Sequence, residues 1–174
     1  MIVMPRGADQ LLLPVNPLFI ASSLLAALVF NLLPLGRHPA MPDLLALTLA
    51  FWAVHQPRRV GVGISFVFGL VMDVHQGALL GQHGLAYTLL AYFALALSRR
   101  LSWFTLTQQA LQVLPLFMAM RAVALLVRLA AGDLFPGWSL FIAPLVEALL
   151  WPVVTFVLLA PQRRAPDPDQ NRPL

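Results

Sequence analysis

The chain has 174 residues, of which 60% are hydrophobic and only 10% are charged. A soluble domain carries about 25% charged residues, so this composition excludes an ordinary soluble globular protein. The apolar residues fall into blocks of roughly 20, which is the length of a helix that crosses a bilayer. The sequence contains no cysteine, which excludes disulfides, thiolate catalysis and cysteine-based metal sites. We therefore expect an all-α integral membrane protein.

Six apolar stretches follow one another along the chain, separated by short segments that contain proline, glycine or arginine. They cover residues 17–35, 41–55, 60–75, 78–97, 110–130 and 138–160. Spans of about 20 residues leave no room for a separate soluble domain, so we expect residues 17–160 to form one bundle of about six transmembrane helices. Residues 98–109 combine two arginines with Trp103 and Phe104, a pattern typical of the membrane interface.

The arginines decide the expected orientation. In a six-span layout eight of them fall on the side of the N-terminal tail (1–16) and the C-terminal tail (161–174), and two on the other side. The eight are Arg6, Arg58, Arg59, Arg99, Arg100, Arg163, Arg164 and Arg172, and the two are Arg37 and Arg128. By the positive-inside rule both tails are cytoplasmic, and the polar, proline-rich C-terminal tail is expected to be disordered. This topology explains the pI of 11.1 without a nucleic-acid partner.

Three ionisable residues lie deep in the predicted spans: Asp73, Arg121 and Glu147. The number of residues from Arg121 to the outer end of its span equals the number from the outer start of the next span to Glu147. Both residues are therefore expected about 13 Å below the outer boundary of the membrane. An ion pair is the expected way to keep two such charges in the membrane. Asp73 lies near the same level, so all three form one cluster if their helices are neighbours. We favour a pair that fixes helix register over a transport or proton-relay role.

Asp73 belongs to a glycine-rich stretch, residues 69–87, inside the longest apolar run. A carboxylate at the bilayer centre costs about 2.5–3.5 kcal/mol or more, so its presence requires a reason. Glycines allow close approach of backbones or a break in a helix. We favour a carboxylate that accepts N–H groups freed at the break, with partner binding as the second interpretation. His75 and His83 lack a metal-ligand spacing and are interpreted as interfacial, and no pattern typical of an enzyme or a cofactor site stands out.

The spacing within this stretch resembles a known family. The motif consists of Gly69, Leu70, Asp73, Gly77, Leu80, Gly81 and Gly84. It is similar to the rod shape-determining protein MreD family of bacteria, whose members are small inner-membrane proteins with five or six predicted spans. The resemblance covers most of the chain in hydropathy and residues 69–87 as a motif.

The resemblance implies a non-enzymatic subunit of the cell-elongation machinery in the bacterial inner membrane. Such proteins bind MreC, and through it the MreB filament inside the cell and the peptidoglycan synthase pair outside. We expect the region from Asp73 to Gly84 to shape the surface that receives the transmembrane helix of MreC or the chain just outside it. Membrane lipids are expected to cover the remaining outer surface.

The family's fold is also similar to the substrate-binding subunits of energy-coupling-factor vitamin transporters, which supplies a competing interpretation. A vitamin site needs a roomy cavity with convergent polar groups, whereas a scaffold needs a surface for a partner helix and a polar anchor. The short outward turns carry no cluster of Asn, Gln, Ser or Tyr, which favours the scaffold. A third interpretation is an ion path through Asp73, Arg121 and Glu147, but no second cluster continues it inward.

Overall fold

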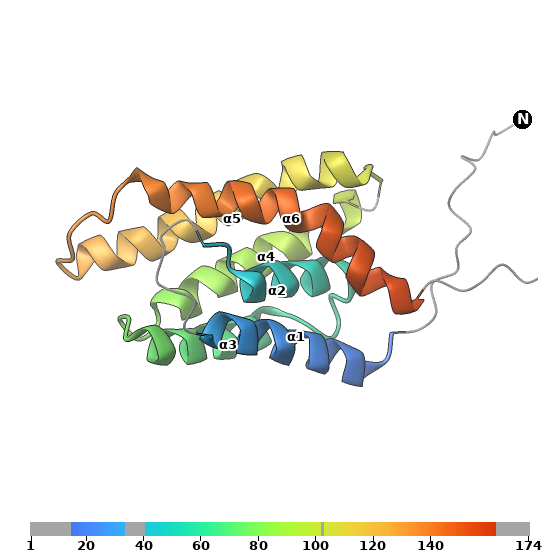
Figure 1. Ribbon diagram of the computed structural model, residues 1–174, viewed down its shortest axis with the longest axis horizontal. Helices are drawn as coiled ribbons and strands as arrows, with labels where there is room; N and C mark the ends of the chain where they lie inside the picture. The colour runs from blue at the N-terminus through green and yellow to red at the C-terminus, as the bar shows by residue number, and fades with distance from the viewer. Residues whose placement is uncertain (1–14, 34–40, 102, 163–174) are drawn as a thin grey trace, which may run out of the picture.

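The computed structural model describes residues 15–33, 41–101 and 103–162 of the chain. Within these ranges the chain forms six α-helices and two short 3-10 helices without any strand, which confirms the all-α prediction. In chain order the elements are α1 (Pro17–Leu32), α2 (Leu44–His55), α3 (Val62–Gln76), α4 (Gln82–Leu101), α5 (Leu106–Ala130), η1 (Trp138–Phe141), α6 (Ile142–Leu159) and η2 (Ala160–Gln162) (Figure 1). Most of both predicted tails and the turn around Arg37 lie outside the described residues.

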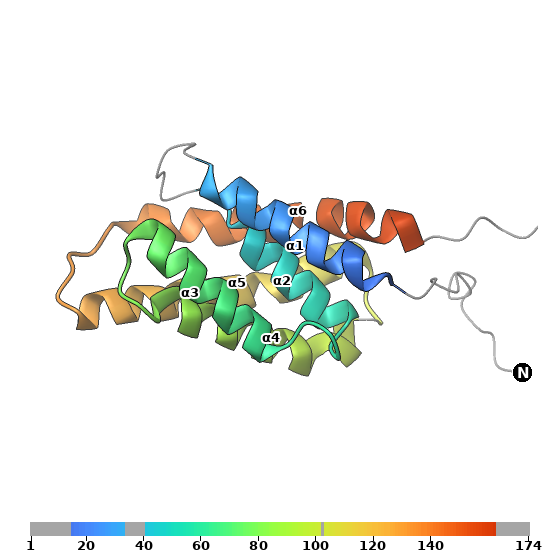
Figure 2. The ribbon, with the colours of Figure 1, turned by 90° about the horizontal axis from the view of Figure 1, so that it is seen from below.

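Successive α-helices run in opposite directions along the long axis of the bundle (Figures 1 and 2). Helix α2 contacts α1, α4 and α6, and helix α4 contacts α2, α3 and α5, so these two helices form the centre. The α2–α3 and α4–α5 connections share one end, which we name the arginine end because it carries Arg58, Arg59, Arg99 and Arg100. The α3–α4 and α5–α6 turns share the opposite end, which we name the turn end.

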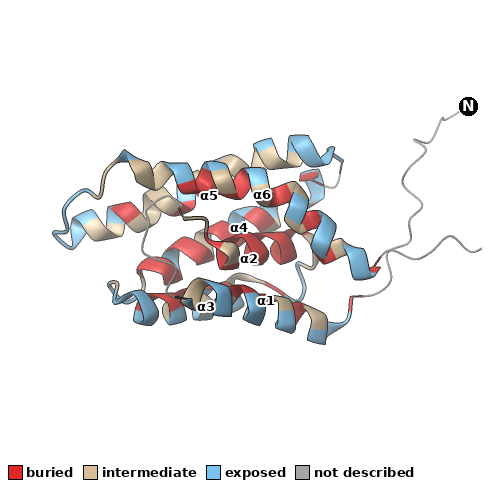
Figure 3. Cartoon of the chain, viewed as in Figure 1, coloured by how far each residue is buried: buried red, intermediate tan, exposed pale blue. Residues whose placement is uncertain are grey.

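Helix α2 is enclosed by the other helices, and ten of its twelve residues are buried (Figure 3). Its sequence is apolar on every face, as expected for a helix surrounded by protein. The indole N–H of Trp52, the polar atom of that fully buried side chain, donates a hydrogen bond of 2.8 Å to Ser23 Oγ on α1. Twelve residues extend only about 18 Å as a helix, so α2 alone does not match a bilayer core of about 30 Å.

The outer surfaces of the bundle are apolar. Leu18 on α1, Val74 on α3 and Leu149 on α6 are 74%, 75% and 77% exposed, and many other large apolar side chains face outward. Within the described residues two segments are both long and apolar enough to cross a membrane, namely Leu106–Ala130 and Trp138–Gln162. Helices α1, α2 and α3 are apolar but shorter. This composition suits a membrane protein, while the layout of six full spans stays a prediction.

Two predicted boundaries are wrong. The fourth helix begins at Gln82 rather than near residue 78, because Gly77 and Gly81 take positive φ values of 62° and 99° and the chain between them forms the turn. Residues 98–109 do not lie wholly between two helices, since α4 continues to Leu101 and α5 begins at Leu106, while their place at the membrane interface stays a prediction. A hydrogen bond of 3.1 Å from the Thr105 N–H to the Gln108 side chain assists that early start.

Candidate functional site

Helices α3 and α4 touch backbone to backbone at Gly69 and Gly84. A Cβ atom added at Gly69 would lie 2.5 Å from Gly84 Cα and 2.6 Å from the carbonyl oxygen of His83. No side chain fits in that space, so the crossing requires glycine at position 69. At Gly84 an added Cβ would meet only side-chain atoms of Phe66 and Leu70, at 3.2 and 3.3 Å. Two glycines of the motif therefore allow the closest contact of the hairpin.

Asp73 caps the first turn of α4 from the end of α3. One carboxylate oxygen accepts the N–H of His83 at 2.7 Å and its ring Nδ1 at 2.8 Å, and the other accepts the N–H groups of Gly81 at 2.8 Å and Gly84 at 3.3 Å. The carboxylate is fully buried. A negative charge at this position also complements the dipole of α4. Asp73 thus serves the hairpin internally and presents no atom to a partner.

The turn between the two helices depends on the remaining glycines. Gly77 ends α3 in the left-handed conformation, where a side chain would be strained, and Gly81 also has a positive φ. The residues between them protrude from the bundle: Leu79 is 54% exposed and Leu80 is 70% exposed. Leu80 is therefore the motif residue that directs a large apolar side chain outward at the tip of the hairpin.

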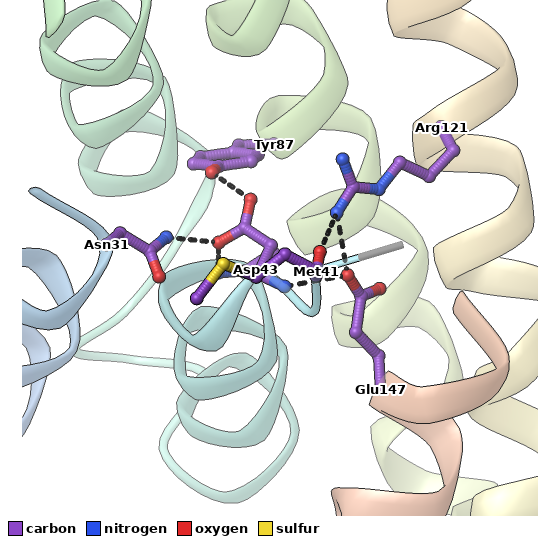
Figure 4. A network of polar contacts seen from close by, with 7 residues as sticks. Asn31, Met41, Asp43, Tyr87, Arg121 and Glu147 are labelled. Carbon is purple, nitrogen blue, oxygen red and sulfur yellow. Dashed lines mark hydrogen bonds and ion pairs between the residues drawn. The ribbon is translucent and has the colours of Figure 1, made fainter. Parts of the chain in front are cut away.

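A second polar site lies on the other side of the bundle, where Arg121 on α5 meets Glu147 on α6. An Arg121 nitrogen lies 2.9 Å from Glu147 Oε1, and the Glu147 side chain is fully buried (Figure 4). The same carboxylate oxygen accepts the backbone N–H of Asp43 at 2.9 Å. The contact is not bidentate, and Arg121 Nε and Glu147 Oε2 have no hydrogen-bond partner among the described residues. The two residues predicted from their equal depth are therefore brought together.

Asp43 connects this pair to three further helices. It is the N-cap of α2, where its carboxylate accepts the N–H of Ala46 at 2.9 Å. It also accepts the side-chain amide of Asn31 on α1 at 2.6 Å and the hydroxyl of Tyr87 on α4 (Figure 4). The network thereby joins α1, α2, α4, α5 and α6 at the turn end. The sequence indicates Asp43 as a first-turn acid after a proline, but not its central place in this network.

The expected single cluster of Asp73, Arg121 and Glu147 does not form. Helix α3 packs chiefly on α4, and α4 stands between α3 and α5, so the condition of neighbouring helices is not met. Asp73 binds His83 and the start of α4 instead. The two sites approach each other where the rings of His83 and Tyr87 meet edge to face, with centroids 6.0 Å apart.

A cavity of about 990 Å³ opens at the turn end, between the α3–α4 and α5–α6 turns. Polar residues from α1, α4, α5 and the cap of α2 contribute to its wall, including Asn31, Asp43, Gln82, His83 and Arg121. The sequence places no such cluster at this end, because these residues are far apart in the chain and only the helix packing gathers them. Among the described residues no group of three or more His, Cys, Asp or Glu side chains is suited to hold a metal ion.

Comparison with known proteins identifies the family. A family model for the rod shape-determining protein MreD matches residues 13–160. A rod shape-determining protein MreD of Haemophilus influenzae is 32% identical over 135 residues, which cover 75% of this chain and 80% of the relative. No solved structure matches the chain, so the similarity to vitamin-transporter subunits stays a prediction. The glycine-rich hairpin and the two long apolar helices agree with this result, and the chain belongs to the MreD family of rod shape-determining membrane proteins.

Proposed function

We propose that this protein is a non-enzymatic scaffold of the bacterial cell-elongation machinery that binds MreC and, through it, couples the MreB filament to peptidoglycan synthesis. Membership of the rod shape-determining family supports this role. The protein spans the inner membrane several times with residues 17–160, and both termini face the cytoplasm. The orientation is supported by Arg58, Arg59, Arg99 and Arg100 at the arginine end, since positive loops stay inside.

The surface that receives MreC is the tip of the α3–α4 hairpin. The observation that carries this proposal is the exposure of Leu80, which is 70% exposed while Gly69, Gly84 and Asp73 are all buried inside the hairpin. Leu79 and Val74 extend the apolar surface around it, at 54% and 75% exposure. At the end of the bundle these side chains lie beside a turn held by hydrogen bonds, where a partner helix can pack on them. Asp73 acts indirectly, because its hydrogen bonds hold the turn that presents Leu80.

The Arg121–Glu147 pair and Asp43 have a structural role in this proposal. Their network joins five helices near one level of the bundle and so fixes how far each helix is shifted along its neighbours. A buried ion pair contributes little net stability compared with apolar packing, but the loss of one partner leaves a costly buried charge. A helix register that separated Arg121 from Glu147 would leave both charges buried without a partner, so the pair favours the register in which the two residues meet. A scaffold with a fixed binding surface requires such a single register.

Co-purification with MreC from the same source, in detergent, tests the proposed surface. Leu80→Gln should reduce the amount of MreC recovered by about tenfold, equivalent to about 1.4 kcal/mol of binding free energy. The matched control is Leu134→Gln, since Leu134 is an 89% exposed leucine in the α5–α6 turn at the same end. Asp73→Ala should also weaken the complex while the protein still inserts into the membrane.

Equal recovery of MreC by wild type and by Leu80→Gln would remove the hairpin tip from the interface. Absence of MreC even with the wild-type protein would refute the scaffold proposal. A small molecule carried through purification of that wild-type protein would then support the vitamin-binding alternative. Failure of Asp73→Ala to accumulate would restrict the role of Asp73 to folding, while Leu80→Gln, which changes an exposed side chain, would still test the surface.

A further inference from the structure

The cavity at the turn end contains hydrogen-bonding groups that the bundle itself does not use. Gln82 lines the cavity and is only 5% exposed, yet its side-chain amide has no hydrogen-bond partner among the described residues. His83 lies beside it in the wall and is 7% exposed. The side-chain atoms of these two residues are not among the fully buried polar atoms that lack a partner, so an occupant of the cavity would replace water at them.

The donor and acceptor pattern of these two residues can be derived from Asp73. The Asp73 carboxylate accepts from His83 Nδ1 at 2.8 Å, so a neutral His83 carries its proton on Nδ1 and offers Nε2 as an acceptor. The Gln82 amide offers both donors and an acceptor. Together they match a ligand that presents N–H and C=O groups side by side, as a polypeptide backbone does.

The charges around the cavity disfavour an anionic occupant such as a lipid phosphate. Arg121 is paired with Glu147 at 2.9 Å, and Arg128 with Asp133 at 3.2 Å, so neither guanidinium is free of a carboxylate. Asp43 adds a further acid, and two cations against three carboxylates leave a formal charge of −1. Among the described residues an incoming phosphate would meet no uncompensated positive charge, whereas a neutral chain would meet no repulsion.

We propose that the cavity receives an uncharged, extended polypeptide segment of the partner, the part that adjoins its transmembrane helix, and that Gln82 and His83 bond its peptide groups. This inference rests on the proposed binding of MreC and assigns a second contact to the same complex. The cavity volume of about 990 Å³ provides the room, and Leu79 of the proposed hairpin surface is one of the residues that line the cavity. A partner helix held at the hairpin tip would thus bring its adjoining chain to the cavity mouth.

The absence of cysteine from the chain allows a direct test with single cysteines. Ala124→Cys places a thiol in the cavity wall, and Leu134→Cys places one in the exposed turn at the same end but outside the wall. Each variant is reconstituted in phosphatidylcholine vesicles with and without MreC, and its reaction with a water-soluble maleimide is timed. MreC should slow labelling at position 124 about tenfold, as expected for a cavity occupied about nine-tenths of the time, and leave position 134 unchanged.

A second variant tests the hydrogen-bonding groups. Gln82→Leu keeps the size of the side chain but removes its amide, so protection of position 124 by MreC should be largely lost. In the protein that keeps Gln82, retention of MreC with no protection at position 124 would overturn the inference while the proposed function stands, and so would full protection in the Gln82→Leu variant. Failure of the protein that keeps Gln82 to retain MreC would instead refute the proposed function and the inference with it. Protection by added anionic lipid without MreC would identify a lipid as the occupant and would also overturn the inference.

Discussion

Replacement of Gly69 by alanine tests the closest contact in the hairpin. The new methyl group would lie 2.5 Å from Gly84 Cα, so α3 and α4 must separate by roughly 1 Å to reach the ~3.5 Å of an ordinary carbon contact. The hydrogen bond from the Gly84 N–H to Asp73, already 3.3 Å long, would then be lost. Overpacking costs about 1–3 kcal/mol, and the loss of a hydrogen bond to a buried carboxylate adds about 1.5–3 kcal/mol.

Thermal unfolding in detergent, followed by loss of the monodisperse fraction, measures this effect. Each kcal/mol corresponds to roughly 2–4 °C in a chain of this size, so Gly69→Ala should lower the midpoint by about 5–24 °C. Gly84→Ala should have a smaller effect, because its methyl group meets side chains that can rotate. The matched control is Gly63→Ala in the same helix, where an added Cβ meets no atom within 4 Å. Equal midpoints for Gly69→Ala and Gly63→Ala would refute the close crossing.

Three further predictions concern the two polar sites. Alanine at either Arg121 or Glu147 should destabilise the protein by about 3–5 kcal/mol because one buried charge loses its partner. Exchange of the two residues should restore part of this loss in the same unfolding assay. If the exchanged protein is no more stable than the single alanine variants, the two residues are not paired. Tyr87→Phe removes a donor to the buried Asp43 carboxylate and should cost about 1–3 kcal/mol, and an unchanged midpoint would show that this hydrogen bond does not form. Asp73→Asn replaces one accepting oxygen by an N–H donor that faces other donors. Hydrogen exchange of the backbone N–H groups at the start of α4, which is expected to be slow in the wild type, should therefore become fast. An unchanged exchange rate would contradict the capping role of Asp73.

The membrane character, the helical class and the depth of the Arg121–Glu147 pair follow from local properties of the sequence. Hydropathy and helix rise depend only on the order of residues, so spans and equal depths can be counted along the chain. The proposal that Asp73 accepts backbone N–H groups at a glycine break rests on the same kind of reasoning, because a buried carboxylate needs donors nearby. The motif glycines likewise indicate a break and a close approach of helices through their spacing alone.

Other features depend on which helices become neighbours, and the sequence does not contain that information in readable form. Asp73 is predicted near the level of Arg121 and Glu147, yet α4 separates it from them, so equal predicted depth is not sufficient for contact. Asp43 has the pattern of an ordinary helix cap, and only the packing of α2 at the centre brings Asn31, Tyr87 and Glu147 to it. The cavity exists because two turns at the same end stand apart, which is a property of the whole bundle and of no single segment.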